Sequence, residues 1–245
     1  MSTGRSVVSV ARWLAAGLGL AAASYAAYVA RTWYRYGHVT DQAGSQDQDE
    51  LLDTFMPDYE VVERHRVSIA APAEIVLIAA SEMDLQGSVI SRGIFKARER
   101  ILGADPDTTL RPRGLLALVT SLGWGVLAEI PGREIVMGAV TQPWMANVVF
   151  RALPADEFAA FHEPDYVKIV WTLRADPLGP AESMFRTETR AVTTDPVSRA
   201  RFRRYWSFLS PGIILIRWLS LGPLKVEAER RARESSALKP TWAAH

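Results

Sequence analysis

The chain has 245 residues, of which 49% are hydrophobic and 22% are charged, and its formal net charge is +1. A charge balance this close to neutral lacks the basic footprint of a nucleic-acid-binding protein, so no nucleic acid is expected as a partner. The absence of cysteine excludes disulfides, thiol catalysis and thiolate metal sites. The histidines, at positions 38, 65, 162 and 245, lack metal-ligand spacing, so no metal or other cofactor is expected.

Residues 1–38 contain an apolar run long enough to cross a membrane. No charge occurs from Trp13 to Ala30, and at about 1.5 Å per residue a helix of this length reaches across most of a roughly 30 Å hydrocarbon core. Tyrosines and tryptophans at its two ends are typical of an interfacial aromatic belt. We therefore predict a single-pass transmembrane anchor near the N-terminus, with a cleaved signal peptide as the alternative. Basic residues flank both ends, so the side of the membrane on which the domain lies stays open.

The rest of the chain divides into a linker, one domain and a tail. Residues 39–56 are expected to be a polar linker, because the stretch from Thr40 to Asp53 is too rich in Asp, Gln, Gly and Ser to bury apolar area. Residues 57–236 are long enough to enclose a single hydrophobic core. Residues 237–245 form the C-terminal tail.

Strict alternation predicts that the domain begins with a strand from Tyr59 to Ile69. Helices are then expected at Glu74–Met83, Val89–Leu102, Leu115–Leu122 and Pro154–His162, and strands at Trp124–Ile130, Arg133–Thr141, Val167–Leu173 and Met184–Val192. Short connections between strands favour hairpins. The prediction is therefore an α+β fold, with an antiparallel sheet and with helices packed on one face.

A long helix from Thr194 to Glu234 is expected to end the domain. Asp195 is a good N-cap, and Pro196 suits the first helical position, where a missing N–H is no loss. Aromatic residues then recur at spacings of three and four, which gives the helix an apolar face that must pack on the strands. Prolines 211 and 223 are expected to kink or break this helix.

Short motifs carry a resemblance to a known superfamily. The stretch Val67–Glu74, Val-Ser-Ile-Ala-Ala-Pro-Ala-Glu, is similar to a first strand that runs into a helix start. Glu188-Thr189-Arg190 and Phe202-Arg203-Arg204-Tyr205-Trp206 look like a last strand and the helix after it, and Gly123-Trp124 and Pro131-Gly132-Arg133-Glu134 look like the same group. Together, from about Tyr59 to Glu234, they resemble the START, pollen-allergen and polyketide-cyclase (SRPBCC) superfamily of helix-grip folds.

This resemblance implies a curved antiparallel sheet wrapped on the long C-terminal helix, with an apolar cavity between them. Members of the superfamily bind lipids, sterols or polyketides, and some are cyclases or hydratases. No universal catalytic motif exists to carry over. The chain departs from the pattern in its membrane anchor and in the proline at position 211 of the grip helix.

Glu63 and His65 are the candidate catalytic residues. They are two apart in the first strand and share its face with Val67 and Ile69, which are expected to point inward. A buried carboxylate beside an imidazole can act as an acid–base pair. If the beginning of the strand lies in water instead, the two side chains form a plain surface contact.

Large aromatics and two threonines are the candidates for lining a ligand cavity. These residues are Trp124, Trp144, Trp171, Phe185, Thr187, Thr189, Tyr205 and Trp206. Taken singly, each aromatic is explained more simply by ordinary core packing. Glu188 and Arg190 have the opposite parity to the threonines, which predicts an outward ladder with Lys168 and Arg174. Reversed parity would instead make Glu188 and Arg190 a site for a polar head group.

The favoured function is a membrane-anchored carrier or sensor of a hydrophobic small molecule such as a lipid, sterol or polyketide. One alternative is a cofactor-independent enzyme, cyclase-like or hydratase-like, that uses Glu63 and His65 on an apolar substrate. The other is a scaffold with no open pocket. Binding is preferred to catalysis because the phosphate-binding and nucleophile-elbow motifs, GxGxxG, the P-loop and GxSxG, do not occur.

Overall fold

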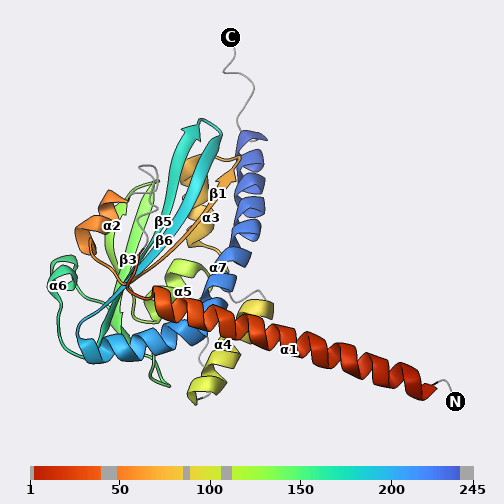
Figure 1. The fold of residues 1–245 in the computed structure, drawn as a ribbon. Helices are drawn as coiled ribbons and strands as arrows, with labels where there is room; N and C mark the ends of the chain where they lie inside the picture. Colours follow the sequence, from red (N-terminus) through yellow and green to blue (C-terminus); the bar gives the residue numbers. More distant parts are fainter. Residues whose placement is uncertain (1–2, 40–48, 85–88, 106–111, 238–245) are drawn as a thin grey trace, which may run out of the picture.

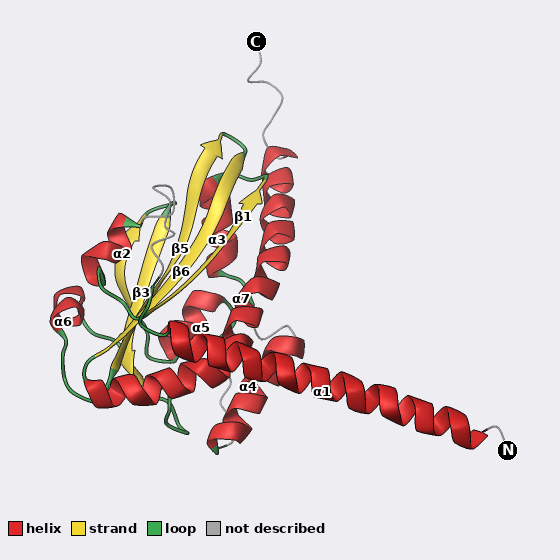
Figure 2. Ribbon diagram, in the orientation of Figure 1, coloured by secondary structure: helices red, strands yellow, loops and turns green. Residues whose placement is uncertain are grey.

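The computed structural model describes residues 3–39, 49–84, 89–105 and 112–237. The predicted α+β class is confirmed: a six-stranded antiparallel sheet has the strand order β1-β6-β5-β3-β2, and β4 pairs with β3 (Figure 2). The strands are β1 (Val61–Ile69), β2 (Gly125–Ile130), β3 (Glu134–Thr141), β4 (Phe150–Arg151), β5 (Val167–Gly179) and β6 (Glu182–Thr193). The helices are α1 (Thr3–Arg35), α2 (Glu50–Phe55), α3 (Ala73–Ser81), α4 (Val89–Leu102), α5 (Leu115–Ser121), α6 (Ala155–Ala160) and α7 (Pro196–Ala237).

The hairpin of β5 and β6 is longer than the sequence pattern predicts. The expected turn at Pro177–Pro180 belongs largely to β5, because pairing with β6 continues past Pro177 and reaches Gly179 through a register shift. A proline is tolerated at such an irregularity, where its missing N–H breaks no regular ladder bond. These two strands form the centre of the sheet on which the helices pack.

The inner face of the sheet carries the main core, beneath α3, α5 and α7. Ile69, Trp171 and Phe185 from three strands are buried there against Val76 of α3 and Leu224 of α7. The long C-terminal helix therefore packs on the inner face of an antiparallel sheet, which confirms the predicted helix-grip arrangement (Figure 1).

Helices also cover the outer face, which corrects the expectation that they pack on one face alone. Phe55 of α2 and Phe158 of α6 lie against Val136, Val140 and Val170. The physical reason is that β3 is buried at every position, so apolar side chains leave both faces of the central strands and both faces need cover. The folded unit thus includes Glu50–Phe55, a segment that the sequence pattern placed in the linker.

Helix α7 begins as predicted and continues further than predicted. The Asp195 carboxylate accepts hydrogen bonds from the backbone N–H groups of Val197 at 2.7 Å and Ser198 at 3.0 Å. The expected breaks at Pro211 and Pro223 do not end the helix, which runs through both residues. Figure 2 shows that its direction changes between its two halves, so a bend takes the place of a break.

The C-terminal end of α1 is docked on the domain. Tyr36 is buried, packs edge-to-face against Phe202 and donates a hydrogen bond to the Glu60 carboxylate at 2.6 Å. Arg203 of α7 donates to the carbonyl of Trp33 at 2.7 Å and lies over its ring. The aromatic residues read as a membrane belt therefore also attach α1 to α7.

The other end of α1 extends away from the domain (Figure 1). Its leucines and Trp13, which is 78% exposed, have no protein to pack against among the described residues. By length and composition, α1 from Arg12 to Arg35 and α7 could each cross a membrane, but α7 is partly buried in the domain. The predicted linker from 40 to 48 and most of the predicted tail lie outside the described residues.

Candidate ligand-binding site

Glu63 and His65 lie in the middle of the inner face of β1. Val61 before them belongs to an apolar cluster with Phe202 of α7, and Ile69 after them belongs to the main core. Both ends of this strand face are thus covered by apolar contacts. Glu63 and His65 are partly buried between them, so the surface-contact reading at the water-exposed beginning of a strand does not describe them.

Three further polar residues face this pair. In the register of β1 and β6, Glu63 is opposite Thr189 and His65 is opposite Thr187. The guanidinium of Arg217, on α7, acts electrostatically on both Glu63 and His65. We call these five residues the polar belt, because they form a polar zone across the interface between the sheet and α7.

The polar belt separates two apolar clusters that contain the predicted aromatic residues. Trp171 and Phe185 lie in the main core, where Trp124 packs edge-to-face on Trp171 with ring centroids 6.1 Å apart. Trp144, Tyr205 and Trp206 lie in the cluster around Phe202. The structure therefore brings the eight predicted ligand-binding residues to one interface, but distributes the aromatics between its two ends.

Two polar atoms of the belt lack hydrogen-bond partners. His65 Nε2 and Thr189 Oγ1 are buried, and neither finds a partner in the described part of the chain. Buried polar atoms are almost always satisfied in native proteins, and each exception calls for a water molecule, an ion or a ligand group. The belt can therefore offer an imidazole nitrogen and a hydroxyl to a molecule held between the sheet and α7.

Burial and Arg217 set the protonation of the pair. Burial raises the pKa of Glu63, although the charge of Arg217 opposes this rise. Burial lowers the pKa of His65, and the charge of Arg217 lowers it further. The imidazole is consequently neutral at neutral pH, when one ring nitrogen donates a hydrogen bond and the other accepts one.

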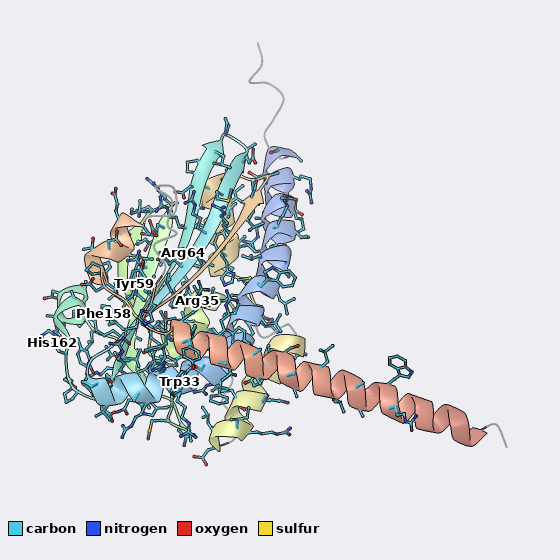
Figure 3. The ribbon with its side chains drawn as sticks, in the orientation of Figure 1. Trp33, Arg35, Tyr59, Arg64, Phe158 and His162 are labelled. Carbon is cyan, nitrogen blue, oxygen red and sulfur yellow. The ribbon has the colours of Figure 1, made fainter. Side chains whose placement is uncertain are left out.

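A pocket of about 480 Å³ reaches the polar belt from the side of α1. Its walls are the C-terminal end of α1, the first half of β1 and α7; the lining residues are Tyr28, Arg31, Thr32, Arg35, Tyr36, His38, Val39, Glu60, Val61, Val62, Glu63, Arg64, Trp206 and Ile214. Arg35 and Arg64, labelled in Figure 3, come from α1 and β1. Trp206 and Glu63 are the predicted site residues that line this pocket.

Glu188 and Arg190 point to the outer face, as their parity predicts, but they are buried there beneath the segment around α2. Arg190 is 2% exposed and donates to the Glu188 carboxylate at 2.7 Å. Arg64 donates to the other Glu188 oxygen at 2.8 Å, and Tyr59, labelled in Figure 3, lies under the Arg190 guanidinium. The alternative of an internal head-group site at Glu188 and Arg190 is therefore wrong.

The expected ladder partners on this outer face also have other contacts. Lys168 donates to the backbone carbonyl of Ala159 at 2.9 Å, and Arg174 donates to Asp176 at 2.8 Å. Among the described residues, no group of three or more His, Asp or Glu side chains is placed to hold a metal ion.

Arg217 is the site residue that the sequence reading missed. The signal was present, since Trp206, Ile213, Arg217 and Leu224 follow one another at spacings of seven, four and seven, the spacing of a single helix face. Arg217 is the one charged residue on the helix face that carries these buried and partly buried apolar residues, so its side chain is directed at the core. Its partner could be identified only once β1 was placed against α7.

Comparisons with known proteins find similar folds and no close relative. No family model matches the chain, and no curated protein matches it. Among solved structures, an aromatase/cyclase from Streptomyces sp. R1128 is similar at 14% identity over 70% of this chain and 94% of its own, with a TM-score of 0.23.

Two further solved structures are similar to the same degree. The CalU16 protein from Micromonospora echinospora has 15% identity over 71% of this chain and 97% of its own, with a TM-score of 0.24. A START superfamily protein from Mycobacterium smegmatis has 13% identity over 71% of this chain and 97% of its own, also with a TM-score of 0.24. At such TM-scores these likenesses carry no argument about ligand or reaction, and the START-like fold of this chain rests on its own arrangement of sheet and helices.

Proposed function

We propose that the chain is a membrane-anchored START-like domain that binds a hydrophobic molecule carrying a polar group between the sheet and α7. The observation that carries this proposal is the polar belt with its two unpartnered atoms, His65 Nε2 and Thr189 Oγ1, set between apolar clusters. Leaving such atoms unpaired is costly, and a ligand group that pairs with them recovers that cost. The aromatic clusters on either side suit the apolar body of the same molecule.

The anchor in this proposal is α1. Its charge-free run from Trp13 to Ala30 is apolar, and its exposed leucines have no partner among the described residues. A helix of this composition is stable in a bilayer and unfavourable in water. Its docked end, at Tyr36, keeps the domain close to the membrane surface.

A thermal-shift experiment with the full-length chain in phosphatidylcholine nanodiscs tests the binding proposal. Oleic acid, a sterol and an aromatic polyketide are the probes, and a molecule held only by the native state stabilises it by RT ln(1 + [L]/Kd), or about 2.7 kcal/mol at a hundredfold excess over Kd. A rise in the melting temperature with one probe supports the proposal. No rise with any probe, together with a crystal structure that has no cavity larger than a few water molecules, would leave the scaffold alternative.

A cyclase-like enzyme is the second candidate. It is favoured by one observation: Glu63 and His65 lie side by side, and their surroundings move their pKa values in opposite directions. For a carrier, Glu63→Gln leaves probe affinity within about threefold, or roughly 0.65 kcal/mol, whereas His65→Ala weakens it by more, because the imidazole that pairs with the ligand is lost. For an enzyme, Glu63→Gln abolishes turnover of the bound substrate while binding survives.

A further inference from the structure

The middle of α7 has an unusual surface for a helix of a domain in water. From Tyr205 to Leu224 the only charged residue is Arg217, which is directed at Glu63 and His65 on β1. The outward side of this stretch therefore offers no charge to solvent. A solvent-facing helix side is normally polar, so this side is expected to meet an apolar partner.

The outward side is a continuous apolar stripe. Phe208, Leu215 and Trp218 are 48%, 42% and 63% exposed. Their spacings of seven and three place them along one side of the helix, opposite the buried Trp206. We call these three residues the α7 stripe.

The docking of α1 indicates what covers the α7 stripe. The Tyr25 hydroxyl donates to the Phe208 carbonyl, and the Tyr28 and Ser210 hydroxyls are hydrogen-bonded at 2.9 Å. These contacts lie within the charge-free run of α1, and the part of that run before Tyr25 begins only at Trp13. That part is about 18 Å long at about 1.5 Å per residue, well short of a roughly 30 Å hydrocarbon core.

A bilayer that takes up the whole charge-free run must therefore also take up the segment of α7 docked on it. Shifting the span toward the N-terminus instead would place the Arg12 guanidinium in the hydrocarbon, which is unfavourable. Figure 1 shows α7 on the side of the domain toward which α1 extends. Lipid is thus the partner that fits both the stripe and the position of α1.

We propose that the α7 stripe is embedded in the interfacial layer of the bilayer that α1 crosses. This inference rests on the proposed anchoring by α1. It places the pocket wall formed by Tyr28 and Arg31 at the lipid surface, with Arg31 at the level of the phosphate groups. A hydrophobic ligand then passes between the bilayer and the pocket without crossing water.

Single cysteines make the test direct, because the chain has none of its own. Full-length Leu20→Cys, Trp218→Cys and Val126→Cys variants are labelled with a nitroxide and reconstituted into phosphatidylcholine–phosphatidylglycerol vesicles. Leu20 reports on α1, Trp218 on the α7 stripe, and Val126 is a matched exposed apolar residue on β2, at the sheet edge opposite β1. The measurement is the collision rate of each label with oxygen, which concentrates in lipid, against that with a water-soluble nickel chelate.

We expect oxygen collisions to dominate for the labels at Leu20 and Trp218 and nickel collisions to dominate for the label at Val126. A label at Trp218 that behaves like the one at Val126, while the label at Leu20 is lipid-exposed, overturns the inference and leaves the anchor in place. Nickel-dominated collisions at Leu20 overturn the anchor, and the inference with it. Leu215→Cys repeats the measurement if Trp218→Cys does not fold.

Discussion

The polar groups at the centre of the two sheet faces differ in how they are paired. On the outer face, Arg190, Glu188 and Arg64 are joined by hydrogen bonds of 2.7 and 2.8 Å, and Thr172 donates to Glu134 at 3.0 Å. On the inner face, two atoms of the polar belt have no partner in the described part of the chain. The hydrogen-bonded charges on the outer face stabilise the fold, whereas the unpartnered atoms of the polar belt can pair with a bound molecule.

The same difference assigns stability to the outer face and ligand binding to the inner face. The outer network holds α2 to the sheet, because the Arg190 guanidinium donates to the carbonyl of Met56 at 2.8 Å, immediately after that helix. The inner belt opens toward the pocket at Glu63. Changes on the outer face should therefore affect the free energy of unfolding, and changes on the inner face should affect ligand binding.

The largest effect is expected for Arg190→Ala. Among the described residues, it leaves the buried Glu188 carboxylate with Arg64 alone, and it removes the bonds to Met56 and Asp53. Breaking a buried charge pair costs about 3–5 kcal/mol. Urea denaturation of the full-length chain in detergent measures this loss. Arg201→Ala, which breaks the exposed pair with Asp165, is the control and should cost about 1 kcal/mol or less. Equal losses in both variants would contradict a structural role for the outer network.

The next effect depends on pH and concerns Glu134. Burial, together with a hydrogen bond to Asp49 and its charge, raises the pKa of Glu134 to about 7 from an ordinary value of 4.5. The folded state then binds a proton that the unfolded state releases, so stability present below pH 4.5 is lost as the pH rises to about 7. At about 1.36 kcal/mol per pKa unit, the loss reaches as much as about 3 kcal/mol.

Glu134→Gln should remove this pH dependence, because an amide keeps hydrogen bonds to Asp49 and Thr172 without titrating. The variant is expected to match the wild type near pH 5 and to be more stable than it at pH 8, as measured by the urea midpoint. Glu157→Gln, at an exposed carboxyl of α6, should leave the wild-type profile unchanged. A Glu134→Gln variant that loses stability equally at both pH values would show that Glu134 is ionised throughout.

The class of fold was predictable because the strongest local signals agreed with it. Asp195 and Pro196 marked the beginning of α7, and the alternation from Tyr59 to Ile69 marked β1 with its inner face. Where the prediction was incomplete, tertiary packing had overridden local pattern. The polar pattern that predicts a linker overlaps short α2, because six residues carry little periodicity. The residue after this helix is bonded to Arg190, which is far away in the sequence.

The candidate site was only half predictable for a related reason. Side chains two residues apart on a strand share a face, which places Glu63 with His65 on β1 and Thr187 with Thr189 on β6. Strand register and helix placement are long-range properties, however, so the pairing across β1 and β6 could not be read from either strand alone. The docking of α1 was hidden as well, because Tyr25 and Tyr36 fit a membrane belt and a protein contact equally well by composition.

The smallest effect gives the sharpest comparison, because replacing threonine by valine should lower the free energy of unfolding on the outer face and raise it on the inner face. Thr172→Val removes the hydroxyl that donates to Glu134, and leaving that buried acceptor less satisfied should cost about 1–3 kcal/mol. Thr189→Val removes a buried hydroxyl without a partner in the described chain, so the ligand-free protein should gain about 1 kcal/mol. Valine matches the shape of threonine, so packing changes little at either site.

Urea denaturation of both variants in the same detergent measures whether each one has a lower or a higher free energy of unfolding than the wild type. Destabilisation by Thr189→Val in ligand-free protein would show that its hydroxyl is already satisfied, and the belt would then be structural. If a ligand bonds to Thr189, saturating the protein with that ligand should stabilise the wild type more than the variant, because the variant lacks the group to be paired. A Thr189→Val variant that is more stable without ligand but binds the ligand less well is expected if Thr189 serves binding at the expense of stability.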